Sequence, residues 1–284
     1  MNKTKIIILT VLLAITLPFI FSEKLLSWIS PRDSNKANIF ETIGKNIAGI
    51  RKQETPLISI TADVPKNEEG LKPIEKPYRV LIMGDSLVAV AGGFGDILEQ
   101  KLITLEDITV LRKGKVSSGM SRPDYFDWQK ESKDLIESFK PNIAIVMMGT
   151  NDAQAFEIVE NNVKKVLNYG TPEWDKEYTN RLKAFNKQLT DNNVRVYFIG
   201  LPAMRDETYG NKIKHINELN QEAKKDNNQV IFISSEKLLE GYKAFMPDEN
   251  GVMRATRLED GIHLTYFGGN LLVDKIIEEI DILQ

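Results

Sequence analysis

Three side chains that could form a nucleophilic relay stand in two short segments far apart in the chain. Ser86 lies in the segment Gly84-Asp85-Ser86-Leu87, and Asp260 and His263 belong to Asp260-Gly261-Ile262-His263. A serine hydroxyl of ordinary pKa is a poor nucleophile, so it needs a neutral imidazole to accept its proton and a carboxylate to fix the tautomer of that imidazole. The residue types therefore predict a catalytic triad of Ser86, His263 and Asp260.

The sequence contains only two histidines that could serve as the base. His215 lies in an amphipathic segment beside charged neighbours, so we expect it on the solvated side of a helix. His263 instead precedes Thr265, which is a suitable N-cap for a last helix from Tyr266 to Ile282. His263 is therefore the expected general base.

Two further segments offer hydrogen-bond donors for the oxyanion of an acyl-transfer reaction. Asn151 stands in Gly149-Thr150-Asn151-Asp152, directly after a second apolar run, and Gly119 lies on a loop between the two apolar runs. Donors fixed around the carbonyl oxygen stabilise the tetrahedral intermediate, and removal of one side-chain donor costs about 3 kcal/mol in a studied serine protease. We therefore expect Asn151 and Gly119 to lie near Ser86.

These four segments, in this order, resemble the blocks of the SGNH (GDSL) hydrolase family, with Ser86, Gly119, Asn151, and Asp260 with His263 at the matching positions. The resemblance covers residues 78–284. It implies a three-layer α/β/α, flavodoxin-like fold, with an oxyanion hole made by the backbone N–H groups of Ser86 and Gly119 and the side chain of Asn151. The segment 118–128 further resembles a poorly characterised bacterial subgroup of cell-envelope members.

The pattern of apolar residues predicts the elements that must position these side chains. Short apolar runs alternate with amphipathic stretches from Tyr78 onward, which indicates a parallel sheet of about five strands covered by helices on both faces. The expected strands are Arg79 to Met83, Ile108 to Arg112, Asn142 to Met148, Val194 to Gly200 and Gln229 to Ile233. The expected helices are Phe94 to Ile103, Pro123 to Phe139, Pro172 to Thr190 and Asn211 to Lys225.

Three other charged residues lie beside the four blocks. Asp85, Asp152 and Arg122 are candidates for substrate binding because they follow predicted strands. The two aspartates are also suited to stabilise turns by accepting hydrogen bonds from local N–H groups. Solvation of a loop arginine is the commoner explanation for Arg122. The sequence leaves these alternatives open.

The first 77 residues differ in character from the remainder. Lys3 and Lys5 precede an apolar run over residues 6–21, which we interpret as an uncleaved signal anchor with the catalytic domain outside the cytoplasm. A signal peptide that is removed is the alternative. The expected organisation is an anchor or signal at 1–29, a proline-containing stalk at 30–77 and the hydrolase domain at 78–284.

Composition excludes several other classes of protein. The net charge of −3 gives no reason to expect a nucleic-acid partner, and the absence of cysteine excludes thiol catalysis and a disulfide scaffold. A dinuclear metal site generally needs more imidazoles than this chain has. No glycine pattern fits a dinucleotide loop. We therefore expect neither a metal nor a cofactor.

The substrate is inferred from the expected location and from the resemblance. We expect an esterase that removes O-acetyl or other short acyl groups from peptidoglycan or polysaccharide of the cell envelope. The acyl-serine intermediate could equally pass its acyl group to a sugar, which would make the protein an O-acetyltransferase. A non-catalytic glycan-binding or scaffold module that partners a membrane acyltransferase is the other alternative.

Overall fold

A five-stranded parallel sheet forms the centre of the fold. The computed structural model describes residues 71–280 and 283. The strand order is β2-β1-β3-β6-β7, with β1 at Tyr78–Gly84, β2 at Ile108–Gly114, β3 at Ile143–Met147, β6 at Arg195–Gly200 and β7 at Val230–Ser234. The predicted parallel sheet is therefore confirmed. The predicted anchor and residues 30–70 of the predicted stalk lie outside the described residues.

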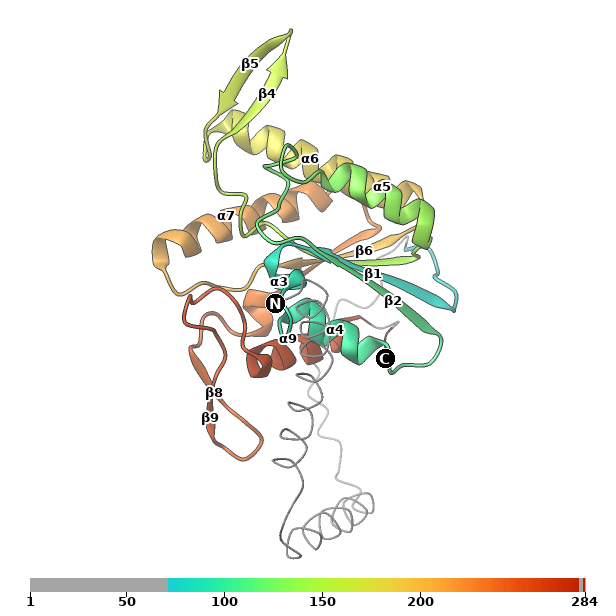
Figure 1. The fold of residues 1–284 in the computed structure, drawn as a ribbon, viewed down its shortest axis with the longest axis vertical. Coiled ribbons are helices and arrows are strands. Elements are labelled where there is room, and N and C mark those ends of the chain that lie inside the picture. Colours follow the sequence, from blue (N-terminus) through green and yellow to red (C-terminus); the bar gives the residue numbers. More distant parts are fainter. Residues whose placement is uncertain (1–70, 281–282, 284) are drawn as a thin grey trace, which may run out of the picture. The chain divides into compact units, whose positions relative to one another are not determined.

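Helices cover both faces of this sheet and give the predicted three layers (Figure 1). One face carries α5 (Trp128–Phe139), α6 (Pro172–Asp191) and α7 (Glu207–Lys224), and the other carries α3 (Ser86–Ala89), α4 (Phe94–Leu102) and α9 (Tyr266–Glu279). A further short helix, α8, spans Ser235–Leu238. None of the helices in the described part of the chain is both long and apolar enough to span a bilayer.

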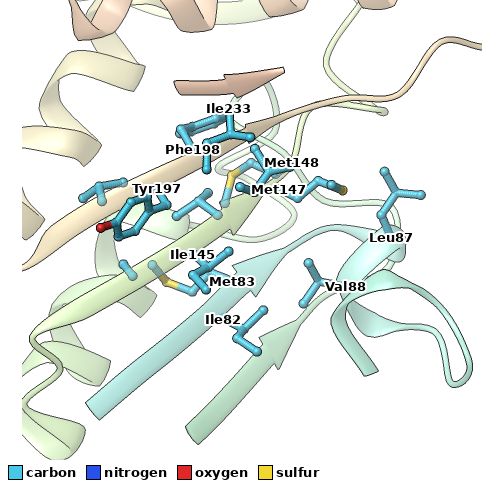
Figure 2. Packing of buried hydrophobic residues seen from close by; sticks show 14 of the residues in the cluster. Ile82, Met83, Leu87, Val88, Ile145, Met147, Met148, Tyr197, Phe198 and Ile233 are labelled. Carbon is cyan, nitrogen blue, oxygen red and sulfur yellow. The ribbon is translucent and has the colours of Figure 1, made fainter. Parts of the chain in front are cut away.

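The central strands are buried on both faces, as expected when helices cover both sides of a parallel sheet. The side chains of Ile82, Ile145 and Phe198 on β1, β3 and β6 pack in one apolar cluster (Figure 2). Leu87 and Val88 of α3 join the same cluster. The backbone turn that carries Ser86 is therefore anchored in the core on both its strand and its helix side.

Two helices begin at places other than those predicted, and capping side chains explain both differences. The helix predicted from Pro123 begins directly after Asp127, whose carboxylate accepts hydrogen bonds from the N–H groups of the next turn. The helix predicted from Asn211 begins one turn earlier, directly after the capping Asp206. In both helices the carboxylate cap determines the first helical residue.

Two β-hairpins were not predicted. The first joins β4 (Phe156–Glu160) to β5 (Val163–Leu167) through Asn161 and Asn162, which both adopt positive φ as a tight two-residue hairpin turn requires. The second joins β8 (Phe245–Pro247) to β9 (Met253–Ala255) and ends five residues before Asp260. Figure 1 shows both hairpins projecting away from the central sheet.

Candidate active site

The turn after β1 and the segment before α9 bring Ser86, His263 and Asp260 into contact. The Ser86 Oγ atom lies 2.9 Å from His263 Nε2, and His263 Nδ1 lies 2.6 Å from Asp260 Oδ2. When Nδ1–H donates to Asp260, Nε2 is left to accept the hydrogen of the Ser86 hydroxyl. The three side chains thus form the hydrogen-bond chain that a nucleophilic serine needs.

The Asp260 carboxylate is held by its own turn. Its Oδ1 atom accepts hydrogen bonds from the backbone N–H groups of Ile262 and His263 at 2.8 and 3.0 Å. The N–H of Leu258 donates to the carbonyl of His263 at 2.8 Å and closes the segment. Partial burial raises the pKa of Asp260, but the hydrogen bonds from the His263 ring and from the two N–H groups outweigh it and keep the pKa below its usual value. Asp260 is therefore ionised when it orients His263.

Asp85, the residue before the nucleophile, ties the first block to the third. Its side chain is fully buried and accepts hydrogen bonds from the N–H groups of Leu87, Gly149 and Thr150 and from the Thr150 hydroxyl, at distances of 2.6–3.0 Å. Burial raises the pKa of Asp85, against the lowering effect of these hydrogen bonds. A carboxylate with four internal donors and no exposed surface cannot contact a substrate, so the substrate-binding expectation for Asp85 is wrong.

Asp152 ties the third block to the second in the same way. It is fully buried and accepts hydrogen bonds from the N–H groups of Met120 and Ser121 and from the Tyr178 hydroxyl, at 3.0, 2.8 and 2.9 Å. Burial raises the pKa of Asp152 to about 6, although these three hydrogen bonds lower it. The substrate-binding expectation is wrong for Asp152 as well.

Both aspartates stabilise turns, but not through the local N–H groups that the sequence suggests. Apart from Leu87, their donors lie between 26 and 65 residues away in the chain. Gly119 shows how tight this packing is, because a Cβ atom there would lie 2.1 Å from Asp152 Oδ1. The glycine of the second block is therefore required by the buried carboxylate.

The three predicted oxyanion donors lie on the loops that these carboxylates connect. Within the described residues, the N–H groups of Ser86 and Gly119 make no hydrogen bond. The Asn151 amide donates to the Ser118 carbonyl at 3.0 Å and to the Thr150 hydroxyl at 3.2 Å. These bonds place the Asn151 side chain against the Ser118–Gly119 peptide unit, on the side of its carbonyl. A substrate oxyanion would share or replace one of the two Asn151 bonds.

Arg122 and His215 lie outside the triad. Arg122 is exposed and forms a two-point ion pair with Asp124, at 2.9 Å from Nε and 2.8 Å from Nη2. The solvated interpretation therefore fits Arg122 better than substrate binding. His215 was expected on the solvated side of its helix, but it is half-buried, and its Nε2 atom lies 2.8 Å from Asp175 Oδ1 on α6. That contact is helix packing between α6 and α7.

Three aromatic side chains that the sequence did not indicate form hydrogen bonds to the loops that carry the site. The Tyr178 hydroxyl bonds Asp152, the Tyr209 hydroxyl donates to the Thr150 carbonyl at 2.5 Å, and the Trp128 indole N–H donates to the Ser118 hydroxyl at 3.0 Å. All three reside on helices of one face of the sheet. No local pattern marks them, because their partners lie on loops that are 10 residues (Trp128), 26 residues (Tyr178) and 59 residues (Tyr209) away in the chain.

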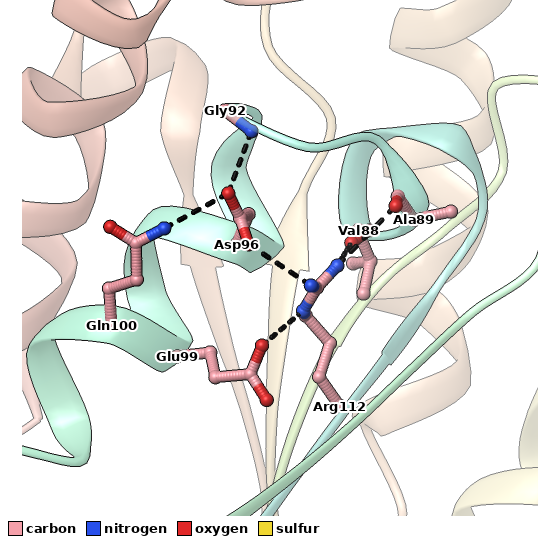
Figure 3. Close-up of polar contacts among 7 residues, drawn as sticks. All are labelled: Val88, Ala89, Gly92, Asp96, Glu99, Gln100 and Arg112. Carbon is pink, nitrogen blue, oxygen red and sulfur yellow. Dashed lines mark hydrogen bonds and ion pairs between the residues drawn. The ribbon is translucent and has the colours of Figure 1, made fainter. Parts of the chain in front are cut away.

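A network centred on Arg112 of β2 supports the segment that follows the nucleophile (Figure 3). Its guanidinium donates to the Val88 carbonyl at 2.9 Å and pairs with Asp96 and Glu99 at 3.0 and 2.6 Å. Asp96 in turn accepts a hydrogen bond from the Gly92 N–H at 2.7 Å. The network thereby holds the end of α3 and the loop between α3 and α4.

That loop and the segment before α9 enclose a pocket of about 250 Å³ beside the nucleophile. Ser86 and His263 are among the residues that line the pocket, and the buried side chains of Leu87, Phe94 and Leu264 form its floor. A group bound in this pocket would therefore be next to the reacting atoms.

Comparisons with known proteins agree with this architecture. Residues 79–279 match the family model described as "Protein of unknown function (DUF459)". No curated protein matches the sequence.

Solved structures share the fold. The acetyl xylan esterase AlAXEase is 18% identical with a TM-score of 0.50, over 71% of this chain and 99% of that one. LAE5, an α/β hydrolase enzyme from the metagenome of Lake Arreo, Spain, is 12% identical with a TM-score of 0.54, over 74% and 98%. TesA is 16% identical with a TM-score of 0.50, over 72% and 99%. At these identities the likeness shows the fold alone, and it agrees with the predicted three-layer α/β/α fold.

Proposed function

We propose that this chain, which belongs to the DUF459 family, is a serine esterase acting on acylated carbohydrate of the cell envelope. The description of the family assigns no function, so the activity is inferred from the site. The observation that carries this proposal is the chain of contacts from Ser86 Oγ through the His263 ring to Asp260, at 2.9 and 2.6 Å. Ser86 is largely buried but lines the open pocket, so a substrate can reach its hydroxyl.

The mechanism follows from these contacts. Ser86 Oγ attacks the ester carbonyl carbon while its proton moves to His263 Nε2, and the imidazolium is stabilised by the Asp260 carboxylate. The carbonyl oxygen becomes an oxyanion beside the N–H groups of Ser86 and Gly119 and the amide of Asn151. His263 then gives the proton to the alkoxide as the carbon–oxygen bond breaks, which leaves an acyl-serine.

Water completes the cycle in an esterase. His263 takes a proton from the water as its oxygen attacks the acyl carbon, and returns that proton to Ser86 Oγ when the acid leaves. A sugar hydroxyl in place of this water would make the protein an O-acyltransferase. Both activities use the same three residues.

The proposed substrate class and location are supported by the N-terminal sequence and by the name of a structurally similar protein, and not by the triad. An outward-facing domain behind a signal anchor, as the basic and apolar N-terminal sequence suggests, would meet peptidoglycan and polysaccharide. An acylated carbohydrate is also the substrate that the name of the structurally similar acetyl xylan esterase states. Acyl esters of envelope glycans, O-acetyl esters among them, are therefore the first natural substrates to test. The non-catalytic alternative is a glycan-binding module that partners a membrane acyltransferase.

The test uses the full chain, purified in detergent, with p-nitrophenyl acetate as substrate and the S86A variant as control. We expect hydrolysis by the native protein and a loss of at least about a thousandfold in kcat/KM in the variant. Equal rates in the two proteins would contradict the serine mechanism. Acetate release from acetylated peptidoglycan and polysaccharide, measured with and without an acceptor oligosaccharide, then separates hydrolysis from transfer.

A further inference from the structure

The pocket beside Ser86 has an apolar lining from floor to rim. Its floor consists of the buried side chains of Leu87, Phe94 and Leu264. Its rim carries Val90, Leu258 and Tyr266, which are exposed by 37%, 46% and 62%. Large apolar side chains exposed together around a concave site indicate a surface that binds an apolar ligand.

Apart from the Tyr266 hydroxyl at the rim, the polar side chains of the lining are already hydrogen-bonded. The Thr265 hydroxyl donates to the Ala255 carbonyl at 2.6 Å and accepts a hydrogen bond from the Gly268 N–H at 3.1 Å. Ser86 and His263 are bonded to each other for catalysis. A sugar ring inside the pocket would find no free side-chain partner below the Tyr266 hydroxyl of the rim, and each of its buried unpaired hydroxyl groups would cost about 1–3 kcal/mol. The pocket therefore suits a hydrocarbon group rather than a sugar.

The size of the pocket exceeds what an acetyl group needs. An apolar cavity of about 150 Å³ is large enough to hold a benzene ring, whereas this pocket measures about 250 Å³. The methyl group of an acetyl ester would leave most of this volume unfilled. A straight chain of roughly six carbons fits the volume better.

We propose that this pocket binds the acyl chain of the ester, and that the protein prefers medium-length acyl groups to acetyl groups. This inference rests on the proposed function, because in a carbohydrate ester the alcohol is the sugar, so a hydrocarbon chain can only be the acyl part. The acyl chain stays in the pocket after the alcohol leaves and thereby holds the acyl-serine in place for attack by water.

The Arg112 network gives the pocket a fixed wall. Arg112 holds the carbonyl of Val88 and, through Asp96, the N–H of Gly92 (Figure 3), and backbone hydrogen bonds of Val90 and Gly93 add to this support of the loop that carries Val90. A wall with a fixed position sets a maximum chain length, since a longer chain must leave the pocket and reach solvent.

The experiment measures kcat/KM of the full chain on p-nitrophenyl acetate, butyrate, hexanoate and octanoate. A buried methylene group contributes about a fourfold gain at most, and since the rim is open we expect kcat/KM for hexanoate to exceed that for acetate by roughly tenfold or more. A parallel series of methyl, butyl and hexyl acetates varies the alcohol instead, and we expect no comparable rise there.

Two substitutions test the pocket itself. Leu258→Gln replaces an apolar rim side chain by a polar one of similar size, and Val90→Phe fills part of the volume; both should lower the ratio of hexanoate to acetate at least about threefold. The matched control is Val159→Gln, which changes an exposed valine on β4 that does not line the pocket and should leave the ratio unchanged. Both rim positions are exposed, so the variants should fold, and circular dichroism checks this.

The outcomes separate this inference from the proposed function. If no ester is hydrolysed, the proposed function fails. If acetate is the best substrate and the two pocket variants keep the native ratio, the esterase stands and the acyl-pocket inference is overturned. A rise in the alcohol series alone would also overturn it, because the pocket would then hold the leaving group.

Discussion

The two halves of the candidate active site are held in opposite ways. The nucleophile half, which contains Ser86, Gly119 and Asn151, is fastened by the fully buried carboxylates of Asp85 and Asp152, whose donors come from distant loops. The base half, from Asp260 to His263, is a turn that bonds mostly to itself and remains partly exposed. One half thus depends on the folded core, whereas the other depends on a local turn.

This difference predicts that substitutions of the buried carboxylates in the nucleophile half mainly reduce stability, whereas substitutions in the base half mainly reduce the rate of catalysis. Removing a buried carboxylate leaves several N–H groups without a partner in the interior, so it should mainly reduce the stability of the fold. Removing a group from the exposed turn leaves few buried polar atoms behind, so it should mainly reduce the rate. Substitutions in the two halves therefore test whether the halves differ in this way.

The largest expected effect is on the rate and comes from the base half. Asp260→Asn removes the charge that stabilises the His263 imidazolium and no longer fixes the required tautomer, so we expect kcat to fall by about 10⁴. The melting temperature should change by only a few degrees, because the carboxylate is partly exposed. Ester hydrolysis and thermal unfolding of the same preparations check both statements, and a large loss of stability would contradict the local-turn description.

The next effect tests the oxyanion hole in the nucleophile half. Asn151→Ala removes the amide beside Gly119 and should lower kcat by about 10²–10³. KM should change much less, since the lost hydrogen bond forms mainly in the transition state. Steady-state kinetics give the two constants separately. A change confined to KM would show that Asn151 binds substrate without stabilising the oxyanion.

The third effect is on stability and contrasts the two halves directly. Asp85→Ala leaves the buried N–H groups of Leu87, Gly149 and Thr150 without their acceptor, and we expect the free energy of unfolding to fall by about 3 kcal/mol or more. Asp260→Ala should cost less than about 1 kcal/mol, because its turn can bond water. Urea unfolding measures both. Equal losses would remove the distinction between the halves.

The smallest effect is a dependence of stability on pH. The pKa of Asp152 in the folded protein is about 6, above its ordinary value of 3.8, so folding favours the protonated carboxyl. The free energy of unfolding should therefore fall as pH rises from about 4 to about 6, by up to about 3 kcal/mol from this group, and should stay level above that range.

Asp152→Asn removes this titration, although the new side chain accepts the hydrogen bonds less well. We therefore expect the variant to be less stable overall but to lose less stability than the native protein between pH 4 and pH 6. Urea unfolding at four or five pH values provides the two curves. Parallel curves would show that Asp152 titrates near its ordinary value.

The sequence predicted the sheet and the residues of the triad, each for a physical reason. Buried parallel strands appear as continuous apolar runs, and the strand ends at Gly84 and Met147 place the following loops at one edge of the sheet. The spacing of Asp260 and His263 fits a single turn, so their contact with each other is local. The contact between Ser86 and His263 spans 177 residues, so it was predicted from the chemistry that a nucleophilic serine needs and from the choice between two histidines, and not from local spacing.

What the sequence did not predict depends on contacts between distant residues. The partners of Asp85 and Asp152 follow from the way three loops pack together, which no spacing along the chain records. The pocket likewise combines residues from either side of Ser86 with residues near position 260. The Asn161-Asn162 hairpin is a different case, because its turn signal is present in the sequence and was overlooked.

The division of the pocket between a floor and a rim has a consequence for how such enzymes diversify. The floor residues Leu87 and Phe94 also belong to the core, whereas Val90, Leu258 and Tyr266 have substantial contact with solvent. Substitutions at the rim should therefore weaken the fold little, and, with the acyl chain bound as we propose, they should change which ester this protein prefers. Directed evolution of this scaffold should begin with libraries at those three positions.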